Sequence, residues 1–176
     1  MMADFPAPRV CGGHVLYLDY DGALHPEGVY QRRGGRPYVR EPAGHELFEH
    51  AGLLFELLLP YPAVRIVLST TWVRILGYRR AAEYLPEALR KRVVGATFHR
   101  EMQREMGRTW FAEMSRGWQV RSDVARRTPI DWLAIDDDVD GWGPVAATHH
   151  VATDPVEGIA SPAVIAKLTG ALNRFR

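Results

Sequence analysis

The chain has 176 residues, of which 47% are hydrophobic and 24% charged. This length and composition predict one globular domain over residues 1–176 and exclude general disorder. The 22 basic and 21 acidic residues leave a formal net charge of +1, so overall charge requires no nucleic-acid or membrane partner. A single cysteine excludes an internal disulfide and fits a reducing compartment.

Neither of the two segments most relevant to membranes or secretion has the required pattern. The longest apolar run, 53–59, is interrupted by Glu56 and is far shorter than the roughly 20 residues that cross a bilayer. The N-terminus carries an acidic residue and two prolines where a signal peptide has a basic start and an apolar core. We expect a cytoplasmic protein with no obligate protein partner.

The first predicted strand leads directly into an acidic loop. Residues 14–18 (HVLYL) are mostly β-branched, aliphatic and aromatic, which is typical of a buried strand, and they run into Asp19-Tyr20-Asp21-Gly22. Residues 23–44 are rich in Gly, Pro and Arg. They predict a flap with a small hairpin around Gly34 and Gly35.

A helix and a second strand follow the flap. The helical spacing of leucines over 45–59 predicts about four turns that stop at Pro60. Residues 64–68 (VRIVL) then have the composition of a strand. That strand closes on Ser69-Thr70-Thr71-Trp72, so its end carries hydroxyl groups.

The second half of the chain continues the alternation. We expect a helix over 81–92, a strand over 93–98, a loop with one helical turn over 100–117, a helix over 117–127, a strand over 132–135, a short strand over 150–152 and a helix over 162–175. Strands that alternate with helices predict an α/β fold with an open, mainly parallel sheet covered by helices on both faces. The ligand crevice of such a sheet lies beyond the carboxyl ends of its strands.

Six aspartates directly follow two of the predicted strands. They are Asp19, Asp21, Asp136, Asp137, Asp138 and Asp140. Close carboxylates repel one another by about 4 kcal/mol per pair at the dielectric of a protein surface, so a cation is expected among them. Oxygen ligands with no cysteine and no histidine pair favour Mg²⁺. A carboxylate can also attack phosphorus, with a second acid two residues on to protonate the leaving group.

At these positions the chain resembles the haloacid dehalogenase-like (HAD) superfamily. The resemblance is carried by LYLDYDGALHP, by VLSTTW, by an arginine about 20 residues ahead of the last motif, and by AIDDD, and it covers most of the chain. The Trp after the second motif and the WLAIDD ending are most similar to small, minimally capped HAD domains associated with bacterial nucleic-acid repair proteins. The resemblance implies a three-layer Rossmann-like fold with a small flap, no large cap, and an Mg²⁺-dependent phosphatase.

The resemblance also implies roles for residues at the first and last motifs. Asp19 would be nucleophile and metal ligand, and Asp21 would be general acid/base with its backbone carbonyl on the metal. An acid at position 21 goes with phosphatases and phosphotransferases in the superfamily, and not with dehalogenases or transport ATPases. Gly22 would help to bind substrate. Asp136 and Asp137 would complete the metal site, directly or through water, while Asp138 and Asp140 would be exposed or orient them, and the run of aspartates leaves the register open by one residue.

Two assignments stay open between neighbouring candidates. Thr70 is our choice for the hydroxyl that binds phosphate, with Ser69 as the alternative, because the Ser-Thr-Thr run leaves the register undetermined. Arg116 is the preferred phosphate-binding cation, with Arg121 as its competitor, since an arginine fork can grip phosphate with two hydrogen bonds.

We expect the substrate to be a phosphorylated small molecule or a nucleic-acid end. The flap interleaves tyrosines with arginines that could hold an anionic substrate, although a solvated hairpin has the same composition. The alternative to a phosphatase is a non-catalytic phosphate- or nucleic-acid-binding module of the same fold. The presence of both Asp19 and Asp21 argues against it, because a binding module does not need an acid/base. Adjacent His149 and His150 would face opposite sides of a strand and are rejected as joint metal ligands.

Overall fold

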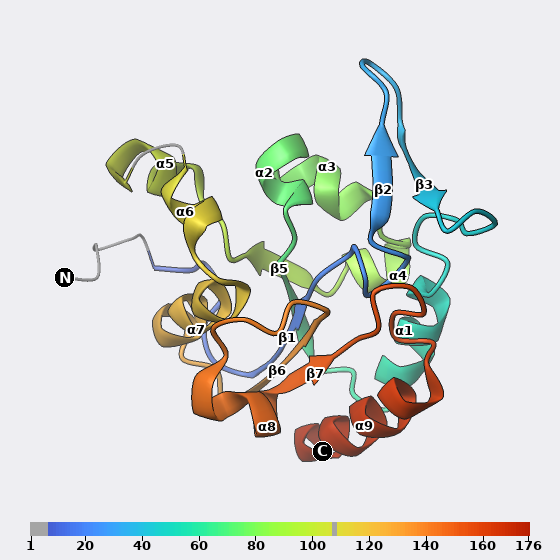
Figure 1. Cartoon of the computed structure of the whole chain (residues 1–176). Coiled ribbons are helices and arrows are strands. Elements are labelled where there is room, and N and C mark those ends of the chain that lie inside the picture. Colours follow the sequence, from blue (N-terminus) through green and yellow to red (C-terminus); the bar gives the residue numbers. More distant parts are fainter. Residues whose placement is uncertain (1–6, 107–108) are drawn as a thin grey trace.

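A five-stranded parallel sheet forms the centre of the protein in the computed structural model, which describes residues 7–106 and 109–176 (Figure 1). Its strands are β1 (His14–Leu18), β4 (Arg65–Leu68), β5 (Val93–Ala96), β6 (Asp131–Asp136) and β7 (His150–Ala152). Their order across the sheet is β5-β4-β1-β6-β7, and every neighbouring pair is parallel. The expected α/β fold with an open parallel sheet is confirmed.

Helices connect the strands and cover the sheet. They are α1 (Ala51–Leu58), α2 (Trp72–Leu76), α3 (Tyr78–Glu83), α4 (Glu87–Arg90), α5 (Arg100–Met106), α6 (Trp110–Glu113), α7 (Arg116–Arg127), α8 (Ala146–His149) and α9 (Pro162–Leu172), with 3-10 turns η1 (Gly143–Val145) and η2 (Asn173–Phe175). Among the described residues, none of these helices is long and apolar enough to cross a membrane.

The sheet is covered on both faces, which makes three layers. Alternate residues of β1 point to opposite sides, so Leu16 and Leu18 join the larger core cluster with side chains of α1, α3, α4 and α9. Val15 and Tyr17 join a second cluster with Val120 of α7. Burial on both faces explains why β1 is apolar without interruption.

The flap is a two-stranded antiparallel hairpin that projects from the body of the molecule (Figure 1). Its strands are β2 (Gly28–Gln31) and β3 (Pro37–Glu41), and Gly34 takes a φ of +75° at the tip. The expected hairpin is therefore present, and no large cap accompanies it in the part of the chain that the structure describes.

Several element boundaries differ from those expected. The helix predicted over 45–59 begins only at Ala51, because the preceding residues form turns in which Phe48 takes a φ of +59°. The helix predicted over 81–92 is divided into α3 and α4 at Pro86, whose ring cannot continue a helix. The predicted loop over 100–117 contains α5 and α6, which bury Met102 and Phe111 against the core.

Candidate active site

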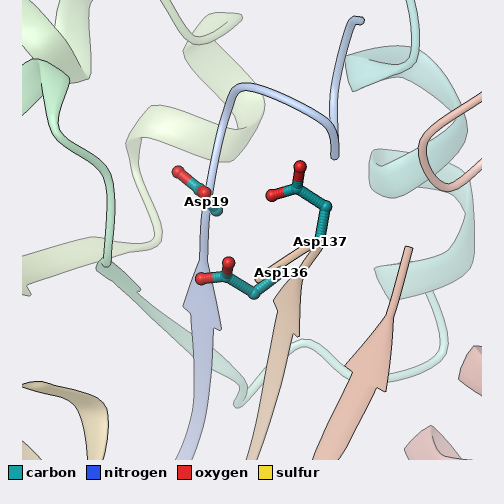
Figure 2. Close-up of side chains that lie close together, drawn as sticks. All are labelled: Asp19, Asp136 and Asp137. Carbon is teal, nitrogen blue, oxygen red and sulfur yellow. The ribbon is translucent and has the colours of Figure 1, made fainter. Parts of the chain in front are cut away.

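Three carboxylates meet at the carboxyl ends of β1 and β6 (Figure 2). Asp19 directly follows β1, Asp136 is the last residue of β6, and Asp137 comes next. The two strands are parallel neighbours, and the backbone N–H of Asp19 donates to the carbonyl of Ile135 at 3.1 Å. Oxygen atoms of the three side chains lie within 4.8 Å of one another. Over the part of the chain that the structure describes, this is the one group of three potential metal ligands.

Arg116, the first residue of α7, lies beside two of these carboxylates. Its Nη2 is 3.4 Å from Asp19 Oδ2, and its Nε is 3.1 Å from Asp136 Oδ2. Gln119, one turn further along α7, accepts a hydrogen bond from Arg116 Nη1 at 3.3 Å. Only 13% of the Arg116 side chain is exposed. The N-terminal end of α7, where the helix dipole is positive, thus faces the carboxylate cluster.

Two glycines hold the start of α7 close to the loop that follows β6. A Cβ on Gly117 would overlap the backbone of Gly141 and Trp142, and a Cβ on Gly141 would overlap Ser115. Gly141 also takes a φ of +76°, which favours glycine. Trp142 is buried in the core. Close backbone packing therefore fixes the distance between Arg116 and Asp136.

The cluster holds more negative than positive charge. Burial raises the pKa of Asp19, against the effect of Arg116, and burial with the neighbouring Asp19 raises the pKa of Asp136 well above its usual range. Burial and Asp19 also raise the pKa of Asp137 to about 6. For Arg116, burial alone would lower the pKa, but the nearby carboxylates outweigh it and raise it. One guanidinium does not balance three carboxylates.

The donor set fits a hard divalent cation. Asp136 Oδ2 and Arg116 Nε are both buried without a hydrogen-bond partner among the described residues, because their ionic contact lies outside hydrogen-bond geometry. A buried carboxylate oxygen without a partner is costly unless a cation or a proton satisfies it. Oxygen ligands with excess negative charge match the preference of Mg²⁺.

Asp21 is not one of the three clustered carboxylates, but its charge acts on Asp19, so the two lie near each other. Both of its carboxylate oxygens accept from Trp72 Nε1 at 3.0 Å, and His25 Nε2 lies 3.0 Å from Asp21 Oδ1. The His25 side chain is fully buried, whereas 27% of the Asp21 side chain is exposed. Asp21 lines a small pocket of about 110 Å³ together with Tyr30 of the flap and Ile75 of α2. The carboxylate is therefore held in one orientation and remains accessible.

The two candidate hydroxyls at the end of β4 have different partners. The Thr70 hydroxyl is close enough to the Asp19 carboxylate to oppose the rise in its pKa that burial causes, and Thr70 Oγ1 accepts from the backbone N–H of Trp72 at 3.4 Å. Ser69 is also buried, but its Oγ has no hydrogen-bond partner among the described residues. The structure thus brings Thr70 to Asp19.

Gly22 and Arg121 occupy supporting positions. Gly22 takes a φ of +70°, and a Cβ there would overlap the side chain of Asp137. The Gly22 carbonyl accepts a hydrogen bond from Thr153 Oγ1 at 2.6 Å. Arg121 is exposed, and its Nη1 donates to the Gly141 carbonyl at 3.4 Å. Its guanidinium thus lies against the loop after β6, while that of Arg116 lies at the carboxylates.

Sequence reasoning missed the partners of Asp21. We used Trp72 only as a mark of resemblance and assigned no role to His25, although His25 lies within the LYLDYDGALHP motif. Its place four residues after Asp21 in a tight loop was the available signal. His149 and His150 contact different groups, Asp131 and the Asp136 carbonyl, and do not form a joint metal site.

Comparison with known proteins gives one match. No curated protein and no solved structure matches the chain. A family model described as "HAD domain in Swiss Army Knife RNA repair proteins" matches residues 15–164, a span that includes every carboxylate and cation of the site. The chain therefore belongs to this family of HAD domains.

Proposed function

We propose that the protein is an Mg²⁺-dependent phosphomonoester hydrolase that works through an aspartyl-phosphate on Asp19. The observation that carries this proposal is the division of the carboxylates into two groups. Asp19 lies in a buried cluster with Asp136 and Asp137, while Asp21 lies at an accessible opening. Membership of the HAD family supports a phosphatase-type activity.

Asp19 and Asp21 then have separate chemical tasks. The Asp19 carboxylate attacks phosphorus, the bond from phosphorus to the leaving oxygen breaks, and Asp21 gives that oxygen a proton. In the second step Asp21 takes a proton from water, which attacks phosphorus and releases inorganic phosphate and free Asp19. The hydrogen bonds from Trp72 and His25 support this role, because they fix the direction of the Asp21 carboxylate.

Arg116 and Thr70 would stabilise the phosphoryl group during transfer. The guanidinium lies within 3.4 Å of the nucleophilic carboxylate, so it can pair with phosphoryl oxygens through its fork of N–H groups. The Thr70 hydroxyl already contacts Asp19 and can donate to another phosphoryl oxygen.

Asp19, Asp136 and Asp137, together with the Asp21 backbone carbonyl, would hold the metal ion. When bound, Mg²⁺ neutralises charge on the phosphoryl oxygens during the displacement. The backbone also orients these ligands, since the N–H of Asp138 donates to Asp136 Oδ1 at 3.1 Å.

The test is hydrolysis of an aryl phosphate with Mg²⁺ and after chelation. Asp19→Asn should abolish turnover, with a loss of at least about 10⁴-fold, because the nucleophile is removed. Asp140→Asn is the matched control, since Asp140 is exposed in the same acidic run, and it should retain activity. Turnover that survives Asp19→Asn or chelation would contradict the proposal.

A panel of substrates then separates a small-molecule enzyme from one that acts on nucleic-acid ends. It contains mononucleotides, sugar phosphates, and oligonucleotides with a 3′- or a 5′-phosphate. If oligonucleotides bind tightly and no ester is hydrolysed, the protein is a non-catalytic nucleic-acid-binding module instead.

A further inference from the structure

A second, larger cavity lies along the edge strand β5, apart from the carboxylate cluster. Its volume is about 1030 Å³. It is lined by the middle of β5, the junction of α2 and α3, the start of α5 and the stretch 7–9. This volume is at the upper limit of the roughly 300–1,000 Å³ of small-molecule pockets, so the cavity has room for a ligand larger than one phosphate ion.

Exposed arginines surround this cavity. They are Arg9, Arg79, Arg80 and Arg100. Within the described residues, none of the four forms a salt bridge or a hydrogen bond, and Glu101 is the one acidic residue among the lining side chains. A fifth lining arginine, Arg127, is already paired with Asp123. The chain as a whole carries a charge of only +1, so these arginines are a local concentration of positive charge.

Aromatic rings accompany the arginines. Tyr78, the first residue of α3, is 41% exposed, and the half-buried His99 lines the wall after β5, whereas Phe98 there belongs to the core. Proteins that bind single-stranded nucleic acid combine guanidinium groups for the phosphates with aromatic side chains on which bases stack. An acidic peptide or a lipid surface would pair with the arginines but would supply no base to stack on the aromatic side chains.

The cavity adjoins the opening at Asp21 through one side chain. Leu76, at the end of α2, lines both the large cavity and the small pocket that contains Asp21. The small pocket also presents exposed aromatic and aliphatic surface, with Tyr30 at 42% and Ile75 at 72% exposure. A ligand that crosses α2 can therefore occupy both.

We propose that the arginine-lined cavity binds the phosphodiester backbone of a single-stranded nucleic acid whose terminal phosphate is the group removed at Asp19. The terminal nucleoside would occupy the pocket beside Asp21, and the strand would cross α2 and place its next phosphates on Arg79, Arg80 and Arg100. This inference rests on the proposed phosphatase function for its catalytic readout. It adds a binding site that a mononucleotide or an aryl phosphate would not reach.

The first test compares substrates of different length. Arg79→Ala/Arg80→Ala should lower kcat/KM for a phosphorylated 10-mer by about 10-fold or more, while kcat/KM for an aryl phosphate stays unchanged. The dependence of log kcat/KM on log salt for the 10-mer should become shallower by about 0.7 for each arginine–phosphate pair that the substitutions remove. Arg65→Ala/Arg90→Ala is the matched control, since it removes the same charge from exposed positions outside the cavity.

The second test separates this inference from the proposed function. Binding of a fluorescent 10-mer without a terminal phosphate is measured on Asp19→Asn, which needs no turnover. Weaker binding after Arg79→Ala/Arg80→Ala, with the control pair unchanged, supports the cavity even if no ester is hydrolysed. Equal binding in all variants, or an equal loss with the control pair, would overturn the inference. So would an acidic 10-residue peptide that competes as well as the oligonucleotide does.

Discussion

The two ends of α7 each place an arginine against aspartate, yet the two clusters differ in how completely their polar atoms are paired. At the C-terminal end, Arg127 Nε donates to Asp123 Oδ2 at 2.8 Å, and the Tyr17 hydroxyl donates to the same oxygen at 2.9 Å. Arg126 adds a hydrogen bond to Asp123 Oδ1 at 2.9 Å. At the N-terminal end, Arg116 contacts the carboxylates of Asp19 and Asp136, and two of the atoms in contact have no hydrogen-bond partner among the described residues.

The difference separates stability from chemistry. The Asp123 cluster joins one buried carboxylate to two guanidinium groups and a hydroxyl, so its oxygens already have partners and none needs a ligand. Arg127 also donates to the Val10 carbonyl, which ties the chain ahead of β1 to α7. The Arg116 cluster has excess negative charge and a buried oxygen without a hydrogen bond from the described residues, so its donor set fits a cation. Substitutions in the Asp123 cluster should therefore lower the free energy of unfolding, whereas substitutions at Arg116 should lower the rate of catalysis.

The largest expected effect on stability is at the paired end. Asp123→Ala removes the common partner of two buried arginines and should lower the free energy of unfolding by about 3–5 kcal/mol. Urea denaturation measures this loss, while kcat of the folded fraction should stay near that of the wild type. A loss below about 1 kcal/mol would contradict the structural role of the cluster.

At the N-terminal end of α7, a substitution should reduce activity much more than stability. Arg116→Ala should lower kcat/KM about 10²–10³-fold, which corresponds to about 2.7–4 kcal/mol of transition-state stabilisation. Its free energy of unfolding in saturating Mg²⁺ should change by less than about 1 kcal/mol. Arg121→Ala, on the same helix but exposed, is the control and should keep near-wild-type kinetics. If Arg121→Ala is the more damaging change, the assignment of Arg116 is wrong.

Binding of Mg²⁺ at the carboxylates beside Arg116 should stabilise the folded protein. Mg²⁺ at about 100 times its Kd should raise the free energy of unfolding by about 2.7 kcal/mol, since a ligand that binds only the folded state stabilises it. Thermal denaturation of Asp136→Asn should show a much smaller gain, and Asp140→Asn should respond like the wild type. If Mg²⁺ stabilises the wild type, Asp136→Asn and Asp140→Asn equally, the ion binds elsewhere.

The smallest effect is a dependence of stability on pH without metal. The pKa of Asp137 is raised to about 6 in the folded state, so the folded protein binds a proton more tightly than the unfolded chain. The resulting stability is present below the unfolded pKa near 3.8 and is lost as pH rises through about 6, by about 1 kcal/mol after allowance for solvent screening. Urea denaturation with a chelator at pH 5 and pH 7 measures this loss, which saturating Mg²⁺ should remove.

The sequence was sufficient to predict the parallel sheet and the aspartates at the ends of its strands, because both depend on local patterns. Apolar runs defined β1 and β6, and parallel neighbours necessarily bring Asp19 and Asp136 to the same edge. The side chain of Asp21 could not be oriented in this way, because its direction depends on Trp72, which lies fifty-one residues away in the sequence. The split of the predicted helix over 81–92 was also missed, although Pro86 was visible.

The choice between neighbouring candidates required three-dimensional information. Whether Arg116 or Arg121 faces the carboxylates depends on the residue at which α7 begins and on its rotation, and the sequence defines neither to within one residue. The arginine-lined cavity has no local motif at all. Its arginines come from the stretch before β1, from α3 and from α5, and only the packing of those elements brings them together.

The glycines around the site have a consequence for the interpretation of natural variants. Gly22, Gly117 and Gly141 carry no functional group, yet the space where each would have a methyl group is occupied by Asp137, by the loop after β6 or by Ser115. An alanine at any of them would push apart the side chains of the proposed active site while leaving every carboxylate and guanidinium present in the sequence. A homologue with all the expected acids and bases but with a larger residue at one of these positions should therefore be considered inactive until tested.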